Sequence, residues 1–232
     1  MQSPSDTRLR LYQEVTLLAL RDKEGTVHFG AAYQYGLAAA LIAELLLEGR
    51  IAIAADGKRQ LVDLVDRTPF DDELLDECLT RLQDAKRRAS LKTWVTRFAG
   101  LKRLKARAAE TLVRSRILKS QEGRVLVFFP RTTYPARDPK PEREIVARMR
   151  RAIFSGSSEI DPRTTLVVAL AHASGILPHV FDKKRLKDRK ARLQHITDGS
   201  LVGKATKEVI EAVNAAVIAA ATAAAVATRG GR

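Results

Sequence analysis

Residues 35–49, YGLAAALIAELLLEG, decide the fold class of this chain. The stretch is apolar on nearly every side up to residue 47, interrupted only by Gly36 and Glu44, and Gly49 is placed to end it. A helix that is apolar all round has no face for solvent and belongs at the centre of a fold. The sequence therefore predicts a buried central helix with other helices packed around it.

Helical patterns continue on both sides of this stretch. Leu11, Val15 and Leu18 recur at the i, i+4, i+7 spacing of an amphipathic helix, and a basic helix is expected from Leu101. Other helices are expected to start at residues that typically cap an N-terminus or occupy the first turn: Asp71 or Asp72, Ser90, Pro141, and Asp161 with Pro162. The expected fold class is therefore mainly α.

Two short β-hairpins are expected between the helices. The first surrounds Asp56-Gly57, which joins apolar strands at residues 51–53 and 61–64. The second is expected at about residues 117–129, with a polar turn at 120–124 followed by an apolar strand: Val125, Leu126, Val127, Phe128 and Phe129. Alternate residues of a strand face opposite ways, so this strand is apolar on both faces. The hairpin's own core, a partner subunit or a lipid surface must cover the second face.

The chain is expected to form a single compact helical domain at residues 9–228, after a short disordered tail at residues 1–8. Its 232 residues can bury a full core. The single cysteine, Cys78, excludes an internal disulfide and indicates a reducing compartment. The alanine-rich segment 208–227 is expected to be a packed terminal helix and not a membrane span, because alanine is weakly apolar and Glu211 and Asn214 interrupt it. No signal peptide is visible.

The charge of the chain indicates an anionic partner. Lysine and arginine number 41 against 27 acidic residues, which leaves a formal net charge of +14. Within residues 81–116 only Asp84 and Glu110 oppose a long series of basic residues, and a second basic cluster lies at 183–192. A third, around Arg148, lies beside acidic residues, so a solvated helix face is equally open there. The excess favours nucleic acid, an anionic membrane or an acidic protein, without choosing among them.

The sequence lacks the motifs of catalysis. It contains no phosphate-binding glycine loop, nucleophile elbow or zinc-protease motif, and its four histidines are scattered without metal-ligand spacing. His172 lies between alanines in a helical pattern and is expected to be a hydrogen-bonded core residue. Cys78 lies among leucines and is expected to be inert packing. We therefore expect no enzyme activity, no cofactor and no bound metal.

Several segments taken together resemble the Golgi phosphoprotein 3 family. In the order of the family, they are residues 11–20 (LYQEVTLLAL) with 23–25 (KEG), 42–50 (IAELLLEGR), 74–77 (LLDE), the helix with Trp94, 112–113 with the hairpin up to 129, 132–135 (TTYP) and 170–174 (LAHAS). Each segment is weak alone, but the ordered set is specific and covers about residues 8–218. The resemblance implies a helical peripheral membrane protein that recognises phosphatidylinositol 4-phosphate, without the family's long N-terminal arm and the partners that the arm binds.

The resemblance also implies where a lipid head group binds. The family pocket consists of an aromatic residue, an arginine on the early buried helix and two arginines three residues apart on the basic helix. The corresponding positions here are Gly30, Ala38, and Lys102 with Lys105. Lysine supplies charge without the planar fork that binds phosphate bidentately. The apolar hairpin is implied to insert into the bilayer or to mediate self-association.

We therefore expect a peripheral protein on the cytoplasmic face of a membrane. Anionic lipid, phosphatidylinositol 4-phosphate or another head group, is expected to contact Lys102, Arg103, Lys105 and Arg107, while the hairpin inserts or forms a homo-oligomer. A homo-oligomeric scaffold for acidic proteins is one alternative. A winged-helix-like nucleic-acid-binding protein is another, although the apolar hairpin and the lack of aromatic residues in the basic helix argue against nucleic acid.

Overall fold

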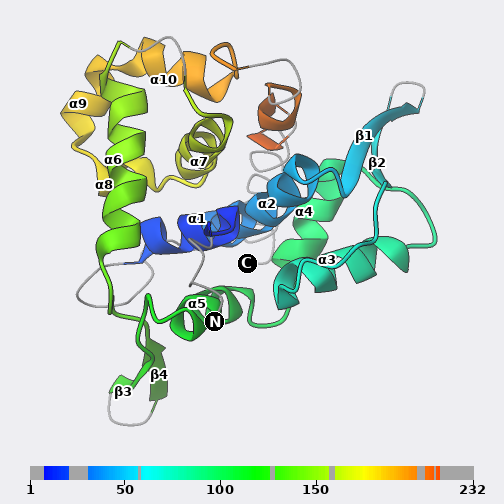
Figure 1. The fold of residues 1–232 in the computed structure, drawn as a ribbon, viewed down its shortest axis with the longest axis horizontal. Helices are drawn as coiled ribbons and strands as arrows, with labels where there is room; N and C mark the ends of the chain where they lie inside the picture. The colour runs from blue at the N-terminus through cyan, green and yellow to red at the C-terminus, as the bar shows by residue number, and fades with distance from the viewer. Residues whose placement is uncertain are drawn as a thin grey trace, which may run out of the picture.

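The computed structural model of the chain (Figure 1) describes residues 8–20, 31–56, 59–125, 129–156, 160–202, 207–211 and 213–214. In chain order its elements are α1 (Leu11–Ala19), α2 (Ala31–Leu47), β1 (Ile51–Asp56), β2 (Arg59–Leu64), α3 (Glu73–Gln83), α4 (Leu91–Ala99), α5 (Leu104–Arg114), β3 (Gln121–Val125), β4 (Phe129–Thr133), α6 (Lys140–Phe154), α7 (Pro162–Ala173), α8 (Leu177–Val180), α9 (Lys183–Asp188) and α10 (Lys190–Thr197). The predicted class, mainly α with two short hairpins, is confirmed.

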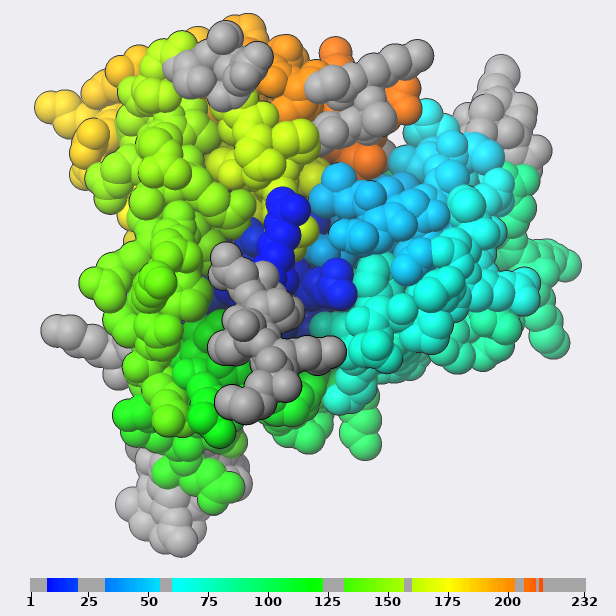
Figure 2. Space-filling view, viewed as in Figure 1, coloured from blue at the N-terminus to red at the C-terminus, as the bar shows by residue number. Residues whose placement is uncertain are grey.

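Helix α2 lies at the centre of the fold, as its apolar sequence predicts. Residues 37–43 are fully buried, and α1, α4 and α7 pack against this helix. Gly36 marks a close approach of α2 to the end of α7, because a Cβ at this position would overlap the Ser174 hydroxyl. Every residue of α1 is buried as well. In Figure 2 the blue N-terminal part of the chain is visible only between the yellow-green and cyan parts.

Local capping chemistry fixes most of the helix starts. Asp72, Ser90 and Asp161 accept backbone N–H hydrogen bonds at the N-termini of α3, α4 and α7, so these predicted caps are confirmed. Pro141 lies in the first turn of α6, where no intrahelical donor is lost. The basic helix begins later than predicted: α4 ends at Ala99, a turn follows, and α5 starts at Leu104.

The first hairpin is confirmed and the second is displaced. Strands β1 and β2 are antiparallel, with Ile51 opposite Leu64 and Asp56 opposite Arg59. Strands β3 and β4 are also antiparallel, but their pairing spans residues 121–133 and not 117–129. The predicted polar turn at 120–124 is therefore wrong, since these residues belong to β3 or lead directly into it. The β3–β4 ribbon projects from the helical body (Figure 1), so β3 has no core face to fill and polar residues suffice.

The prediction for Cys78 is confirmed, that for His172 is wrong, and the predicted chain ends are only partly described. Cys78 is fully buried, and burial raises the pKa of its thiol, as expected of inert packing. His172 is exposed on α7, so the expected core histidine is wrong. The predicted tail at 1–8 lies outside the described residues except for Arg8. Of the predicted terminal helix, residues 208–211 and 213–214 are described and helical.

Candidate functional site

The start of α5 gathers basic residues on the surface. Leu101 and Leu104 are both 2% exposed and anchor the turn between α4 and α5, while Lys102 and Arg103 stay exposed. Arg103 has a left-handed backbone (φ 55°), and no described side chain caps the N-terminus of α5. The Arg103 guanidinium contacts Glu110 at 2.6 Å, a surface ion pair that an incoming anion can exchange at little cost. The positive end of the helix dipole adds to these charges.

Lys105 completes this group from the first turn of α5. Its ammonium lies 5.8 Å from the centre of the Tyr33 ring on α2. Burial lowers the pKa of Lys105 below its ordinary value. A partly desolvated cation interacts more strongly with an anion than a fully hydrated one does. Lys102, Arg103 and Lys105 are called the α5 cluster below.

Arg107, the fourth predicted lipid contact, is held against α3. Its guanidinium contacts Glu73 at 2.8 Å and Glu77 at 2.6 Å, and 18% of the side chain is exposed. Burial alone would raise the pKa of Glu77, but hydrogen bonds from Arg107 and Arg81 hold that pKa below its ordinary value. Arg107 therefore joins α5 to α3, and we leave it outside the α5 cluster.

The remaining positions that the resemblance implies are not part of the α5 cluster. Ala38 is fully buried in α2 and supplies packing where the family pattern has an arginine. Gly30 lies outside the described residues. The structure thus brings together the two lysines of the implied pocket without its arginine on α2.

Two residues of the predicted apolar strand lie at the outer end of the β3–β4 ribbon. Val125 and Phe129 are the last paired residues of the two strands. Leu126, Val127 and Phe128, which the sequence singles out for insertion, lie outside the described residues. At its other end the ribbon joins the body, where Ile117 and Leu118 are 8% and 3% exposed.

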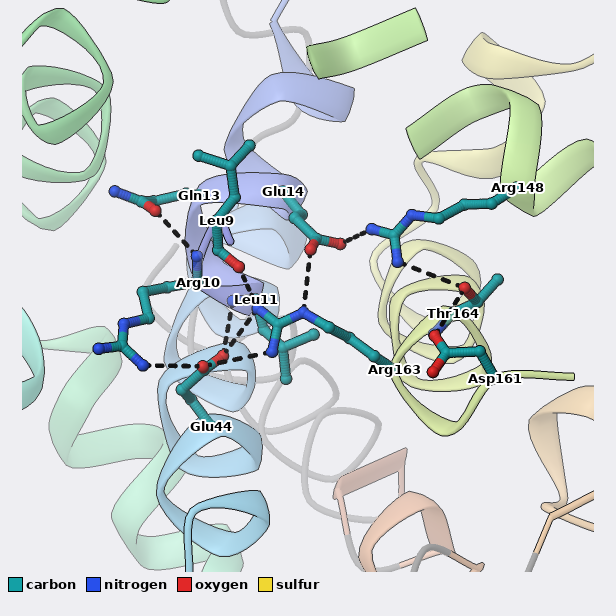
Figure 3. A network of polar contacts seen from close by, with 10 residues as sticks. All are labelled: Leu9, Arg10, Leu11, Gln13, Glu14, Glu44, Arg148, Asp161, Arg163 and Thr164. Atoms are coloured by element: carbon teal, nitrogen blue, oxygen red, sulfur yellow. Dashed lines mark hydrogen bonds and ion pairs between the residues drawn. The ribbon is translucent and has the colours of Figure 1, made fainter. Parts of the chain in front are cut away.

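A buried ionic network lies inside the helical body (Figure 3). Glu14 on α1 and Glu44 on α2 are 3% and 1% exposed. Arg163 on α7 contacts both carboxylates, at 3.0 Å and 3.2 Å, and Arg148 on α6 also contacts Glu14. The backbone N–H of Leu11 donates to Glu44 at 2.7 Å. The network therefore joins four helices through paired charges.

Sequence reasoning missed this network. Glu44 stands out only as an interruption of an apolar helix, Arg148 belongs to the third basic cluster, and nothing singles out Arg163. The available signal was Glu44 itself, because a carboxylate in an otherwise buried helix needs a buried partner. Burial raises the pKa of Glu14, while Arg148 and Arg163 lower it. Since all these groups satisfy one another, their arrangement serves to fix the helices.

The described ranges lack two other kinds of feature. Within those ranges, no cluster of three or more histidine, cysteine or acidic side chains could hold a metal ion. No helix of the described part of the chain has the length and apolarity needed to cross a membrane.

Comparison with known proteins identifies the family. The family model described as Golgi phosphoprotein 3 (GPP34) matches residues 11–213, so this chain belongs to the Golgi phosphoprotein 3 family. The chain is also similar to vacuolar protein sorting-associated protein 74 of Schizosaccharomyces pombe, with 25% identity over 223 residues. That match covers 82% of this chain and 66% of the relative, so the chain spans slightly less than two thirds of the relative's length. The resemblance noted from the ordered sequence segments is confirmed.

Proposed function

We propose that this chain is a peripheral membrane protein that binds anionic lipid head groups at the α5 cluster. The observation that carries the proposal is the convergence of Lys102, Arg103 and Lys105 on a helix start that no described side chain caps. A helix N-terminus favours a phosphate group, and neighbouring cations strengthen the attraction. Membership of the Golgi phosphoprotein 3 family supports a phosphoinositide as one candidate head group.

The composition of the α5 cluster favours charge over a shaped phosphate pocket. Lys102 and Lys105 stand where the resemblance implies two arginines, and lysine acts as a point charge without bidentate geometry. Ala38 leaves no cation on the adjoining part of α2. We therefore expect binding to follow the surface charge of the membrane, with phosphatidylinositol 4-phosphate acting mainly through its high charge. Each basic residue near such a surface contributes about 1 kcal/mol.

The end of the β3–β4 ribbon supplies the second part of the proposal. Burying two of the large apolar residues Leu126, Phe128 and Phe129 in lipid would contribute roughly 3–6 kcal/mol. The charge contacts and the apolar insertion would each give only marginal membrane binding alone, and together they would give stable binding. The same apolar residues can meet a second copy of the chain, which makes a homo-oligomer an alternative use of the ribbon.

Liposome flotation with the whole chain tests the proposal. Three vesicle types are compared: neutral phosphatidylcholine, phosphatidylserine in phosphatidylcholine, and phosphatidylinositol 4-phosphate in phosphatidylcholine at matched surface charge. We expect flotation with both anionic types, none with neutral vesicles, and loss of flotation in the double variant Lys102→Glu with Lys105→Glu. Lys92→Glu with Lys140→Glu is the matched control, because it makes the same change in net charge at exposed lysines on α4 and α6.

The outcomes separate the candidate functions. Absence of flotation on any anionic vesicle overturns the membrane function and favours the scaffold, for which light scattering would show an oligomer. Survival of flotation in the variant at positions 102 and 105 shows that another surface contacts the lipid. Equal loss in the control pair shows that only the net charge of the protein matters.

A further inference from the structure

A pocket lies at the opposite end of the helical body from the α5 cluster. Residues of α7, α8, α9 and α10 line an open pocket with a volume of about 520 Å³. In Figure 1, α9 and α10 lie at the top of the molecule, while α5 and the β3–β4 ribbon lie at the bottom. The volume falls within the range of about 300–1,000 Å³ that is typical of small-molecule sites.

The pocket combines an apolar floor with a basic rim. Leu177, Leu186 and Leu193 line the floor and are 1%, 8% and 7% exposed. Three exposed lysines line the rim: Lys183, Lys187 and Lys190. None of these lysines has an ion-pair partner among the described residues, and none of the described lining residues is acidic. Cations and apolar surface therefore face the same space.

Uncharged polar groups occupy another part of the lining. His172 in the last turn of α7 lies beside Gln194 and Thr197 of α10 in this lining. Desolvation by neighbouring groups lowers the pKa of His172 below its ordinary value. These three side chains can hydrogen-bond a polar head group without adding charge. The histidine expected in the core thus lies in this pocket instead.

We propose that the pocket binds a free single-chain amphiphile with an anionic head group, a class that includes long-chain carboxylates and alkyl phosphates. The chain would lie on the three leucines, and the head group would lie among Lys183, Lys187 and Lys190. An apolar floor alone would accept any apolar ligand, but three lysines without an ion-pair partner among the described residues select a ligand that carries negative charge at one end. The pocket is remote from the α5 cluster, so this ligand is distinct from the membrane lipid proposed there.

Fluorescence titration of the whole chain tests this proposal in the absence of vesicles. The probe is cis-parinaric acid, a naturally fluorescent long-chain carboxylate, held below its critical micelle concentration. Competitors are palmitate, dodecyl phosphate and the uncharged detergent dodecyl maltoside. We expect one binding site, displacement by the anionic competitors, and little displacement by the uncharged one. An unbound probe, or equal displacement by dodecyl maltoside, would overturn the proposal.

Variants locate the binding event. Lys183→Gln with Lys187→Gln should weaken probe binding by about tenfold or more, the effect of losing one or two charge-assisted contacts. Lys184→Gln, on the same helix but outside the lining, is the control and should bind as the unaltered chain does. Gln194→Trp, which fills the pocket from an exposed position, should also abolish binding. Equal effects of the lining and control lysines would overturn the proposal.

A direct readout and a cross-check complete the test. The His172 imidazole signals in NMR should shift on addition of palmitate, because the head group lies beside this ring. The variant Lys102→Glu with Lys105→Glu should bind the probe normally even where it fails to bind vesicles. Loss of probe binding in that variant, or unchanged His172 signals at saturating palmitate, would show that the amphiphile binds elsewhere.

Discussion

Arg163 illustrates how much structure a single buried side chain can organise. It contacts Glu14 on α1, Glu44 on α2 and the carbonyl oxygen of Leu9, which precedes α1. Its partners lie far away in sequence, with Glu44 separated by 119 residues. Because a charge removed from water needs a partner, losing one member leaves the others uncompensated. The network therefore stabilises the fold only while each buried charge keeps its partner.

We predict that Arg163→Met is severely destabilising. It leaves two carboxylates at 3% and 1% exposure with fewer cationic partners, a situation that typically costs about 3–5 kcal/mol. Urea denaturation measures the free energy of unfolding, and the exposed Arg151→Ala on α6 is the control, expected to stay within about 0.5 kcal/mol of the unaltered chain. A loss below about 1 kcal/mol for Arg163→Met would contradict the assigned role.

At the scale of elements, two helix contacts can be tested separately. The first joins α5 to α3 through Glu77, whose pKa is held below its ordinary value of 4.5. A carboxyl group with a lowered folded pKa stabilises the folded state above its unfolded pKa, and this contribution is lost as the pH falls through the folded pKa. Glu77→Gln should therefore cost about 1 kcal/mol near neutral pH and progressively less below about pH 4.5.

The measurement for Glu77 is a set of urea midpoints between about pH 7 and pH 3 for the unaltered chain and the variant. Comparing the two chains cancels the titration of the other carboxyl groups. A difference in stability that stays constant over this range would show that the Glu77 contacts with Arg107 and Arg81 make no contribution through ionisation.

The second contact is the close approach of α2 to the end of α7. A methyl group at Gly36 would overlap the Ser174 hydroxyl, and Ser174 is 1% exposed, so there is little room to move it. Gly36→Ala should therefore destabilise the chain by about 1–3 kcal/mol despite the better helix propensity of alanine. Adding Ser174→Gly should restore part of that loss in a double-mutant cycle measured by thermal unfolding. Strict additivity of the two changes would contradict direct contact.

Local chemistry explains which elements could be predicted from the sequence. The caps at Asp72, Ser90 and Asp161 act within one helical turn, so their outcome depends on neighbouring residues alone. The predicted position of the second hairpin is wrong because polar residues can form a strand when the ribbon projects from the body, and only the tertiary structure shows that it does. The buried network was not predicted for a related reason: the sequence indicates that Glu44 needs a buried cationic partner, but only the tertiary structure shows which residue this is.

The candidate site was also only partly predictable from the sequence. The sequence indicated the basic stretch, and the structure exposes Lys102 and Arg103 there. The sequence could not distinguish Arg107 from the exposed basic residues, because its two acidic partners lie on a different helix, α3. The pocket lined by α7, α8, α9 and α10 was also not predicted from the sequence, because its leucines and lysines match ordinary amphipathic helix faces until these helices are packed together.

At the scale of the whole molecule, the net charge of +14 bears on how the chain would approach a membrane. Long-range attraction brings a basic protein to an anionic surface from many orientations and weakens as salt shortens the Debye length. Apolar insertion acts only after contact and is much less sensitive to salt. In the proposed function, charge therefore brings the protein to the membrane, and the end of the β3–β4 ribbon keeps it bound there.

Salt and the ribbon should consequently act together on membrane binding. We predict that raising the salt from about 0.1 M to about 0.5 M weakens flotation of the unaltered chain on anionic vesicles and leaves a residual fraction bound, since the Debye length shortens to a few ångströms while insertion persists. Leu126→Ser with Phe128→Ser should retain binding at low salt and lose the residual fraction at high salt. Lys102→Glu with Lys105→Glu should show the reverse weakness, failing already at low salt because approach and head-group contact are impaired. Identical salt curves for the unaltered and serine variants would mean that the ribbon contributes nothing to retention, and self-association would then be its remaining use.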